Sequence, residues 1–280
     1  MIRFFVVVFL FFGFLAFGDE VQIQENPLTK QIKTLIDEKV YEQNKAYIKI
    51  IFSPESNYYK GKRVDVLKVV KTLKDNGLLE LFFKRPRELT LSFKTSGAPL
   101  FFVKIMGDTL RNIGYYKYVT TKSALNASEF VWTISLNSEY ATDPLILQKE
   151  LQKRGCSIVA IERESAYRWS YVIDMREGHL NLVVLHDAQQ VRLKRSLYAH
   201  WLDVSKVKKL TIRSSSRNSW YPYIAYYDPS LHLLKVLKID EKRRKLTLNV
   251  PNGARYLKVS DIYTLKNIKD SLILTPRGTR

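Results

Sequence analysis

The sequence predicts an α+β fold, with three tandem βαβ units in the order of split βαβ modules, followed by a small all-β sandwich. Three observations support this prediction. Apolar residues at helical spacing alternate with short β-type runs three times between about residues 45 and 175. Each of these helical stretches ends in glycine. Beyond residue 200 the helical spacing disappears, and short strands separated by turns take its place.

Residues 1–18 have the pattern of a signal peptide. Arg3 gives a positive start, residues 4–17 are an unbroken apolar run, and Gly18 follows as a small residue at the expected cleavage point. This run is shorter than the roughly 20 residues that a membrane-spanning helix needs. We therefore expect export to the periplasm, cleavage after Gly18 and no transmembrane span in what remains. The alternative is that the segment stays as an uncleaved anchor.

An α+β domain of βαβ repeats with an N-terminal helix is expected over residues 19–180. Asn26 and Pro27 are a helix-start signal, because asparagine caps a helix and proline suits its first turn. Apolar residues then recur at helical spacing, which predicts a helix over residues 27–44. Residues 47–52 alternate and predict the first strand.

The three βαβ units have the same order of elements, a strand, a helix that ends in glycine, and a second strand. Their helices end at Gly77, Gly114 and Gly155, where a chain commonly leaves a helix through a left-handed residue. The third helix opens at Asp143 and Pro144. Leading strands are expected at 47–52, 89–94 and 130–137, following strands at 78–83, 115–122 and 156–163, and a closing strand at 167–174, with hairpin turns at 84–87 and 164–166.

The rest of the chain reads as a linker or edge strand over residues 181–200 and a basic β-sandwich domain over 201–280. Strands are expected at 207–213, 221–227, 231–239, 245–250, 255–259 and 271–275. Turn residues at 228–230, 240–242 and 251–253 separate them. Six or seven short strands in about 90 residues are typical of a small sandwich.

Positive charge is concentrated in this last part. Residues 181–280 hold 20 basic and 7 acidic side chains, whereas residues 19–180 hold 25 and 20. In a cytosolic protein this would suggest nucleic acid. The export signal argues against nucleic acid and favours envelope proteins or an anionic envelope surface as partners. The alternative is that the positive charge only keeps the protein soluble and serves no particular partner.

No cofactor, metal or catalytic motif is present in the sequence. No two of the four histidines are four residues apart, as a metal-binding pair on a helix would be. Neither a glycine-rich phosphate loop nor a G-x-S-x-G motif occurs. The single Cys156 follows Gly155 and opens an apolar strand, which favours a buried thiol over a reactive one. We therefore expect a protein that is not an enzyme.

The most unusual segment is the aromatic run at residues 220–227. Strand alternation places Tyr221, Tyr223 and Tyr227 on one side and Trp220 with Tyr226 on the other. One side forms the core, and the other is either an exposed aromatic row for a partner or sugar ring or is covered by other parts of the protein. The candidate binding residues are Trp220, Tyr221, Tyr223 and Tyr227, with the cations Arg213, Arg217, Lys242, Arg243 and Arg244.

Two resemblances follow from these features. The element order over residues 45–175 resembles that of envelope modules such as secretin N-domains, polypeptide-transport-associated domains and SPOR domains. No motif of those families is present. Gly155 with Cys156, residues 220–228 and residues 261–265 resemble segments of uncharacterised exported proteins from campylobacter-type bacteria. That resemblance implies a periplasmic setting and no activity.

Three functional hypotheses remain open. The first is a non-catalytic periplasmic adaptor or scaffold that binds envelope-associated proteins, for instance as an accessory component of a flagellar motor or secretion machine. The second is peptidoglycan or glycan binding through the aromatic and basic C-terminal face. The third, from a different class, is an enzyme whose site is assembled from scattered residues.

Overall fold

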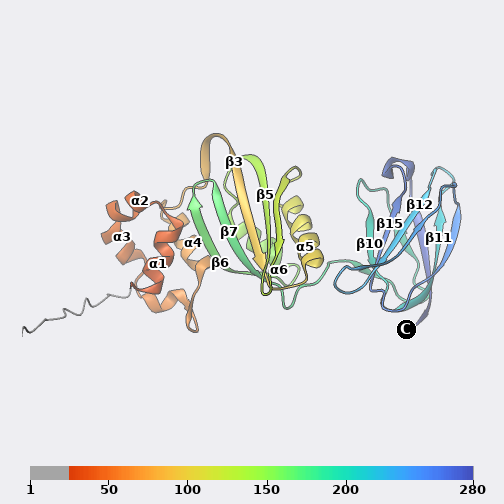
Figure 1. Ribbon diagram of the computed structural model, residues 1–280, viewed down its shortest axis with the longest axis horizontal. Helices are drawn as coiled ribbons and strands as arrows, with labels where there is room; N and C mark the ends of the chain where they lie inside the picture. The colour runs from red at the N-terminus through yellow and green to blue at the C-terminus, as the bar shows by residue number, and fades with distance from the viewer. Residues whose placement is uncertain (1–24, 280) are drawn as a thin grey trace, which may run out of the picture.

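The computed structural model describes residues 25–279 and shows a mixed α and β protein, as the α+β prediction requires (Figure 1). The expected signal peptide and its cleavage point lie outside the described residues. None of the helices within residues 25–279 is both long and apolar enough to cross a membrane.

Helices and a long-stranded sheet make up residues 25–175, which we name the α+β module. The helices are α1 (Pro27–Leu35), α2 (Glu38–Gln43), α3 (Lys45–Ile51), α4 (Val66–Asp75), α5 (Pro99–Asn112) and α6 (Pro144–Gln152), with a short 3-10 turn at Glu55–Tyr58. The strands are β1 (Tyr59–Lys60), β2 (Arg63–Val64), β3 (Phe82–Thr95), β4 (Val119–Leu125), β5 (Phe130–Tyr140), β6 (Ser157–Ser165) and β7 (Arg168–Asp174).

The main sheet of this module has the strand order β4-β5-β3-β7-β6. Strand β3 pairs antiparallel with β5 and parallel with β7, and β7 pairs antiparallel with β6. Without β7, the sequence β3-α5-β4-β5-α6-β6 has the order of a split βαβ module. The last strand, β7, is inserted between β3 and β6, which makes the sheet five-stranded.

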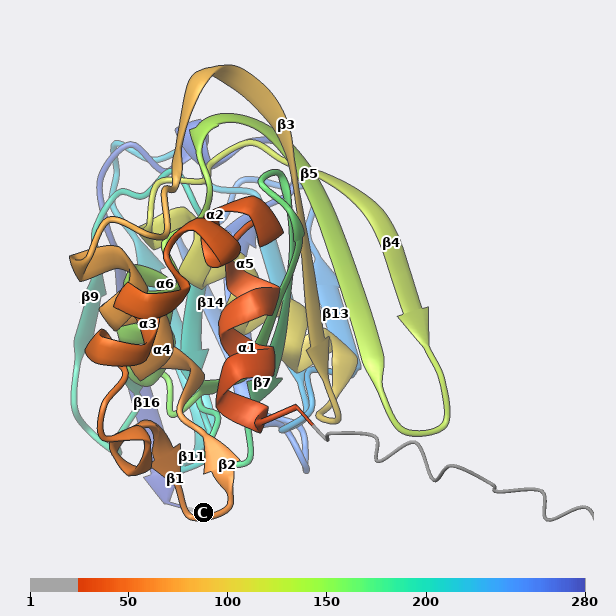
Figure 2. The same cartoon turned by 90° about the vertical axis from the view of Figure 1, so that its left-hand side faces the viewer.

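One face of this sheet is apolar and buried, because its strands alternate as expected. Leu91 and Phe93 of β3 lie beside Ile134 and Trp132 of β5, and all four are buried. The other face is polar, with Ser92 hydrogen-bonded to Thr133 at 3.0 Å. Figure 2, which looks along the molecule from the α1 side, shows β4 as the outermost strand, with only β5 beside it.

The predicted helix starts and ends are confirmed where local chemistry defines them. Asn26 accepts a hydrogen bond from the Leu28 amide at the start of α1, and Asp143 accepts one from Leu145 at the start of α6. Gly77, Gly114 and Gly155 all have positive φ, at 70°, 103° and 67°. Each helix therefore ends where only glycine relieves the left-handed strain.

The first predicted βαβ unit is wrong, because residues 47–51 belong to helix α3 and Phe52 is its C-cap, so no strand forms here. Ile48 and Phe52 are both buried and lie four residues apart, a spacing that suits a helix as well as a strand. Ile50, which a strand would have buried beside them, is 71% exposed. The single helix expected over 27–44 is also divided, since Ile36 is extended and separates α1 from α2.

The strand expected at 78–83 and the hairpin expected at 84–87 are likewise absent. Residues from Phe82 onward belong to one long strand, β3, that continues to Thr95. Its pairing with β5 shifts register between Phe82 and Arg87. The basic, proline-containing segment that suggested a turn is therefore an irregular stretch of the same strand, where proline is tolerated.

Two sheets make up residues 183–279, which we name the β-module. Its strands are β8 (Val183–Val184), β9 (Val191–Leu193), β10 (His200–Asp203), β11 (Val207–Ser214), β12 (Pro222–Tyr227), β13 (Leu233–Lys238), β14 (Lys245–Asn249), β15 (Tyr256–Asp261) and β16 (Leu272–Thr279). Short 3-10 turn residues Leu265–Asn267 precede β16. The six expected strands lie close to β11 through β16. The short strands β8 and β9 lie in the segment expected to be a linker or edge strand, and β10 begins at its last residue, His200.

The two sheets have the orders β13-β12-β15-β10-β8 and β14-β11-β16-β9. Their inner faces contribute to one hydrophobic core that includes Leu210, Ile212, Ile224 and Leu257. The sheets are named below the five-stranded and the four-stranded sheet of the β-module. Each has one outer face, turned away from that core.

The β-module rests on α5 through the outer face of its five-stranded sheet. Tyr256 stacks on Phe101 of α5 with ring centroids 6.3 Å apart, and both residues are buried. Trp201 of β10 lies under the Lys104 ammonium at 5.2 Å and beside Tyr227 at 5.0 Å. Tyr256 and Leu231 belong to the hydrophobic core of the α+β module. The two modules therefore share a packed boundary.

Candidate functional site

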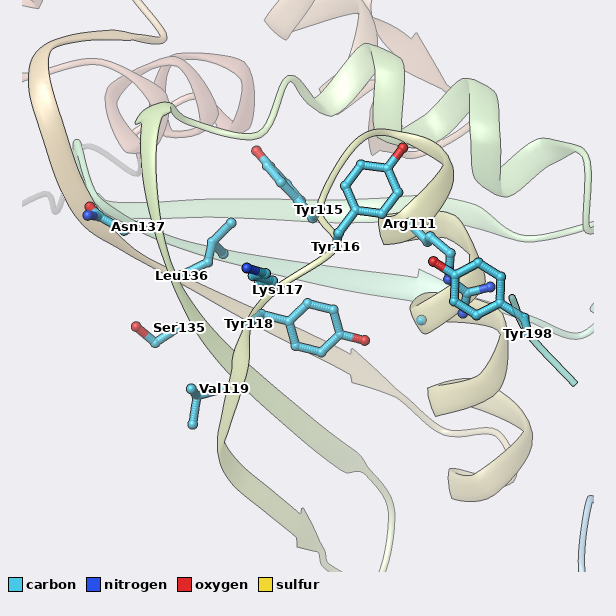
Figure 3. A pocket seen from close by; sticks show the side chains of 11 residues that line it. Arg111, Tyr115, Tyr116, Lys117, Tyr118, Val119, Ser135, Leu136, Asn137 and Tyr198 are labelled. Atoms are coloured by element: carbon cyan, nitrogen blue, oxygen red, sulfur yellow. The ribbon is translucent and has the colours of Figure 1, made fainter. Parts of the chain in front are cut away.

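A pocket of about 590 Å³ lies at the C-terminal end of α5, where β4 and β5 pass beside it. Figure 3 shows its lining, with Arg111 and Tyr198 side by side at one end and Ser135 and Asn137 towards the other. Three of its tyrosines come from the segment between α5 and β4, and the fourth comes from the connection between β9 and β10. The lining residues are Gly107, Arg111, Tyr115, Tyr116, Lys117, Tyr118, Val119, Ser135, Leu136, Asn137 and Tyr198.

The tyrosines are held by local geometry. After Gly114 ends α5, the extended segment to β4 turns successive side chains in different directions. Tyr115 accepts a hydrogen bond from the Thr142 hydroxyl at 2.9 Å, and Tyr118 packs edge-on against Trp132 at 5.7 Å. Burial raises the pKa of both Tyr115 and Tyr118, so their phenols stay neutral. Tyr116 is 71% exposed and is free to meet a ligand.

Gly107 in the middle of α5 leaves room for Tyr118. A Cβ at this position would stand 3.4 Å from the Tyr118 hydroxyl, at the edge of ordinary contact. Glycine weakens an exposed helix by about 1 kcal/mol relative to alanine. Here it lets the phenol lie close to the helix backbone at the floor of the pocket.

Arg111 is the central cation of the site. Its guanidinium lies 4.4 Å from the centroid of the Tyr198 ring, and its Nη2 is 3.2 Å from Oδ1 of Asp108. Asp108 also accepts a hydrogen bond from Lys104, so two cations share its charge. The pocket lining itself contains Arg111 and Lys117 and no carboxylate. Its electrostatic character is therefore positive, with aromatic surfaces around the charge.

Two further hollows adjoin this pocket. One of about 440 Å³ lies between α5 and the β-module and is mostly apolar, with Val103, Trp201, Tyr227 and Leu233 in its walls. The other, of about 470 Å³, lies between α5 and α6 and includes Glu150 and Lys153. Arg111 lines all three hollows. We name these three adjoining hollows, which share Arg111 on the exposed side of α5, the α5 groove.

The groove adjoins a free sheet edge. Val119, which lines the pocket, is the first residue of β4. All seven residues of β4 are exposed, and β4 has no neighbour on its outer side among the strands of residues 25–279. Val119 and Leu125, its two end residues, are each 67% exposed. Such an edge offers unpaired backbone groups to an added strand.

The structure divides the aromatic row that the sequence predicted. Trp220 is fully buried, and its indole Nε1 donates to the Ser260 carbonyl at 2.8 Å, so it belongs to the core and is wrong as a binding residue. Tyr227 lies at the boundary with α5. Tyr223 remains half-buried at the surface, with the ammonium groups of Lys238 and Lys258 at 5.7 and 5.6 Å from its ring.

Tyr221 and the predicted cations lie elsewhere. Tyr221 packs edge-on against Tyr263 at 5.2 Å. Arg213 is on β11 in the four-stranded sheet, whereas the tyrosines are on β12 in the five-stranded sheet, so they face opposite sides of the β-module. Arg217 pairs with Asp270 at 2.9 Å, Arg243 pairs with Glu241 at 2.6 Å, and Lys242 and Arg244 are exposed in the turn before β14.

Sequence reasoning missed the α5 groove. Its local signal is the run Tyr115, Tyr116, Lys117 and Tyr118 directly after the glycine that ends α5. That run was interpreted as the start of a strand and not as a surface. Tyr198 is separated from it by about 80 residues, and its position over Arg111 depends on how the β-module packs.

Cys156 and His232 lie where a structural role accounts for them. Cys156 is 2% exposed, and burial raises the pKa of its thiol to about 11. His232 stands 3.0 Å from Asp228 in the β12–β13 turn. In the part of the chain that the structure describes, no three His, Cys, Asp or Glu side chains are grouped so that they could hold a metal ion. Comparison with known proteins assigns no family, since no family model matches the chain and no curated protein matches its sequence.

Proposed function

We propose that this chain is a non-catalytic adaptor of a bacterial cell envelope, working in the periplasm, and that its α5 groove binds a partner protein. The observation that supports the groove as the binding site is the lining of its pocket beside β4, which has four tyrosines and two cations and no carboxylate. Tyrosine gives a large contact area at a small loss of conformational entropy, and arginine adds a directional charge.

The chemistry of the groove favours an acidic, partly apolar segment of the partner. Arg111 and Lys117 complement carboxylates, and the hollow beside Trp201 and Leu233 accepts an apolar side chain. The free edge of β4 begins at the same place. An extended partner segment is therefore able to pair its backbone with β4 while its side chains enter the groove.

The finer architecture belongs to the same proposal. We take residues 82–174 as a split βαβ module with one inserted strand and the β-module as a β-sandwich. Two modules with a packed boundary provide two separate surfaces on one rigid support, which suits an adaptor. Export by residues 1–18 would place it beside envelope machinery, such as a flagellar motor or a secretion apparatus, as an accessory component.

Site-specific photocrosslinking in the producing bacterium tests the groove. A photoreactive amino acid at Tyr116 should give one discrete adduct, which mass spectrometry identifies. The adduct should disappear when Arg111→Glu is added. The same photoreactive group at the exposed Lys149 on α6 is the control. Adducts that are absent, or that are the same from both positions, would contradict the proposal.

Peptidoglycan or glycan binding through the β-module is the second candidate, and one observation favours it. Tyr223 holds its ring at the surface between two lysines, an arrangement that could stack on a sugar ring beside a carboxylate. Under this candidate, Tyr223→Ala weakens sedimentation with purified peptidoglycan and leaves the fold intact. Equal sedimentation of the two proteins removes the candidate.

A further inference from the structure

The outer face of the four-stranded sheet carries cations in a regular arrangement. Residues paired across neighbouring strands share a face, so the register places Lys245, Arg213, Ile273 and Arg192 in one row. A second row across the sheet contains Thr247, Thr211 and Thr275, and a third contains Asn249, Lys209 and Arg277. Threonines therefore occupy the centre, with three cations in the row on one side of them and two in the row on the other. We name this surface the cationic sheet face.

Four of the five cations on this face have no ion-pair partner within residues 25–279. The strands β9, β11, β14 and β16 contain no aspartate or glutamate. Lys209, Arg213, Lys245 and Arg277 are exposed, and in residues 25–279 no carboxylate lies within ion-pair distance of them. Arg192 alone has a partner, Asp270, whose oxygen is 3.7 Å away.

The cationic sheet face is also free of the rest of the chain. The β-module packs on α5 through the outer face of the other sheet, which holds Trp201 and Tyr256. Figure 1 shows β11 at the end of the molecule farthest from α1 and α3. Lys242 and Arg244, in the turn before β14, add positive charge at one end of the face, where the Arg244 carbonyl accepts from the Ser214 amide at 2.8 Å.

The face differs from a typical protein interface. Protein interfaces usually have aromatic or aliphatic side chains at their centre. Here the centre consists of hydroxyls, two of which, Thr211 and Thr247, lie 3.2 Å apart, and Ile273 is the single, half-buried apolar residue. Phosphate groups in a plane match this composition, because cations provide attraction at a distance and hydroxyls donate hydrogen bonds to phosphate oxygens.

We propose that the cationic sheet face binds the phosphate head groups of an anionic phospholipid bilayer, with the four-stranded sheet lying flat on the membrane. The attraction comes from Lys209, Arg213, Lys245, Arg277 and Arg192, and the threonine row contacts the phosphates between them. No side chain enters the hydrocarbon. Binding is therefore reversible and salt-dependent, and it is independent of whatever the α5 groove holds.

Vesicle co-sedimentation of residues 19–280 tests this, since residues 4–17 are apolar enough to bind bilayers themselves. Vesicles with about one phosphatidylglycerol in three lipids should bind the protein at low salt, and vesicles of phosphatidylcholine alone should not. Binding should fall steeply at high salt, where charges are screened over a few ångströms. The double variant Arg213→Glu/Arg277→Glu should bind at least about tenfold more weakly.

The matched control is Lys39→Glu/Lys149→Glu, which changes the net charge equally at two exposed lysines of the α+β module that lie in no ion pair of the described residues. It should bind nearly as wild type does. If charge reversal prevents folding, Arg213→Gln/Arg277→Gln replaces it and should still bind measurably more weakly. Equal losses in the face variant and the control would overturn the proposal. The proposal would also be overturned if the wild-type protein did not bind anionic vesicles but did bind an acidic protein or peptidoglycan.

Discussion

The guanidinium of Arg111 lies 4.4 Å from the centroid of the Tyr198 ring, which joins the end of α5 to the chain just before β10. Phe101 of α5 also stacks on Tyr256, and the Lys104 ammonium of α5 lies 5.2 Å from the centroid of the Trp201 ring. Together they connect two modules that are otherwise linked by the segment between β7 and β8. Each cation–π contact contributes about 0.5–1 kcal/mol at an exposed site.

Trp201→Ala should loosen this boundary without unfolding either module. The substitution removes the ring that Lys104 and Tyr227 contact. Proteolysis in the segment between β7 and β8 should become about tenfold faster, because boundary contacts limit local opening. Tyr263→Ala, at an exposed tyrosine of the β-module, is the control and should cleave at the wild-type rate. Unchanged cleavage of Trp201→Ala would show that the boundary does not depend on this ring.

Gly155→Ala and Gly77→Ala form a matched pair. Both glycines have φ near +70°, so each alanine pays about 1 kcal/mol for a left-handed backbone. A Cβ on Gly77 meets nothing within 4 Å, whereas one on Gly155 would overlap the Glu177 carbonyl oxygen. Chemical denaturation should show a loss of about 1 kcal/mol for Gly77→Ala and at least about 3 kcal/mol for Gly155→Ala. Equal losses of unfolding free energy would mean that the loop at Glu177 moves away from the added Cβ at no cost.

Glu150 should make stability depend on acid pH. Burial raises the pKa of its carboxyl, but hydrogen bonds from Asn112, Lys153 and Arg154 outweigh burial and hold the pKa at about 2. A carboxyl with a lowered folded-state pKa stabilises the protein above its unfolded pKa, near 4.5, and this stabilisation is lost as pH falls towards 2. Its size is on the order of 2 kcal/mol.

Unfolding free energies of wild type and Glu150→Gln at about pH 6 and about pH 3 measure this effect. The wild type should lose more stability than the variant over this interval, because the variant has no carboxyl to protonate. Parallel losses in the two proteins would assign the acid sensitivity to other carboxylates.

Cys156 should be inert in the folded protein. Burial raises the pKa of its thiol to about 11, and the thiolate is the reactive form. A maleimide reagent at neutral pH should label native protein at least about 100-fold more slowly than protein in denaturant. Rapid labelling under native conditions would mean that the strand opening at β6 exposes the thiol. Cys156→Ala should fold normally and remain unlabelled.

The sequence predicted those parts of the fold that local chemistry controls. The caps at Asn26 and Asp143 and the glycines at 77, 114 and 155 were interpreted correctly, because their effect depends only on neighbouring residues. The strand predicted at residues 47–52 was wrong, because Ile48 and Phe52 fit a helical face as well as a strand face. Strand β10 was missed because only four residues define it and its partners β15 and β8 are distant in sequence.

The candidate sites were harder to predict, because each depends on pairing between distant segments. Alternation alone correctly put Trp220 and Tyr226 on the opposite side from Tyr223, but it did not show which of the tyrosines the α5 helix covers. Arg213 is close to Tyr223 in sequence and yet lies on the other sheet. The cationic sheet face appears only when β11 is set beside β14 and β16.

The stack of Phe101 on Tyr256 has a mechanical consequence. Because this contact is buried, a pull on the α5 groove reaches the β-module through packed side chains as well as through the covalent connection between β7 and β8. The packed boundary thus fixes the orientation of the α+β module relative to the β-module. A partner in the α5 groove would be held at a constant distance from whatever surface the four-stranded sheet touches.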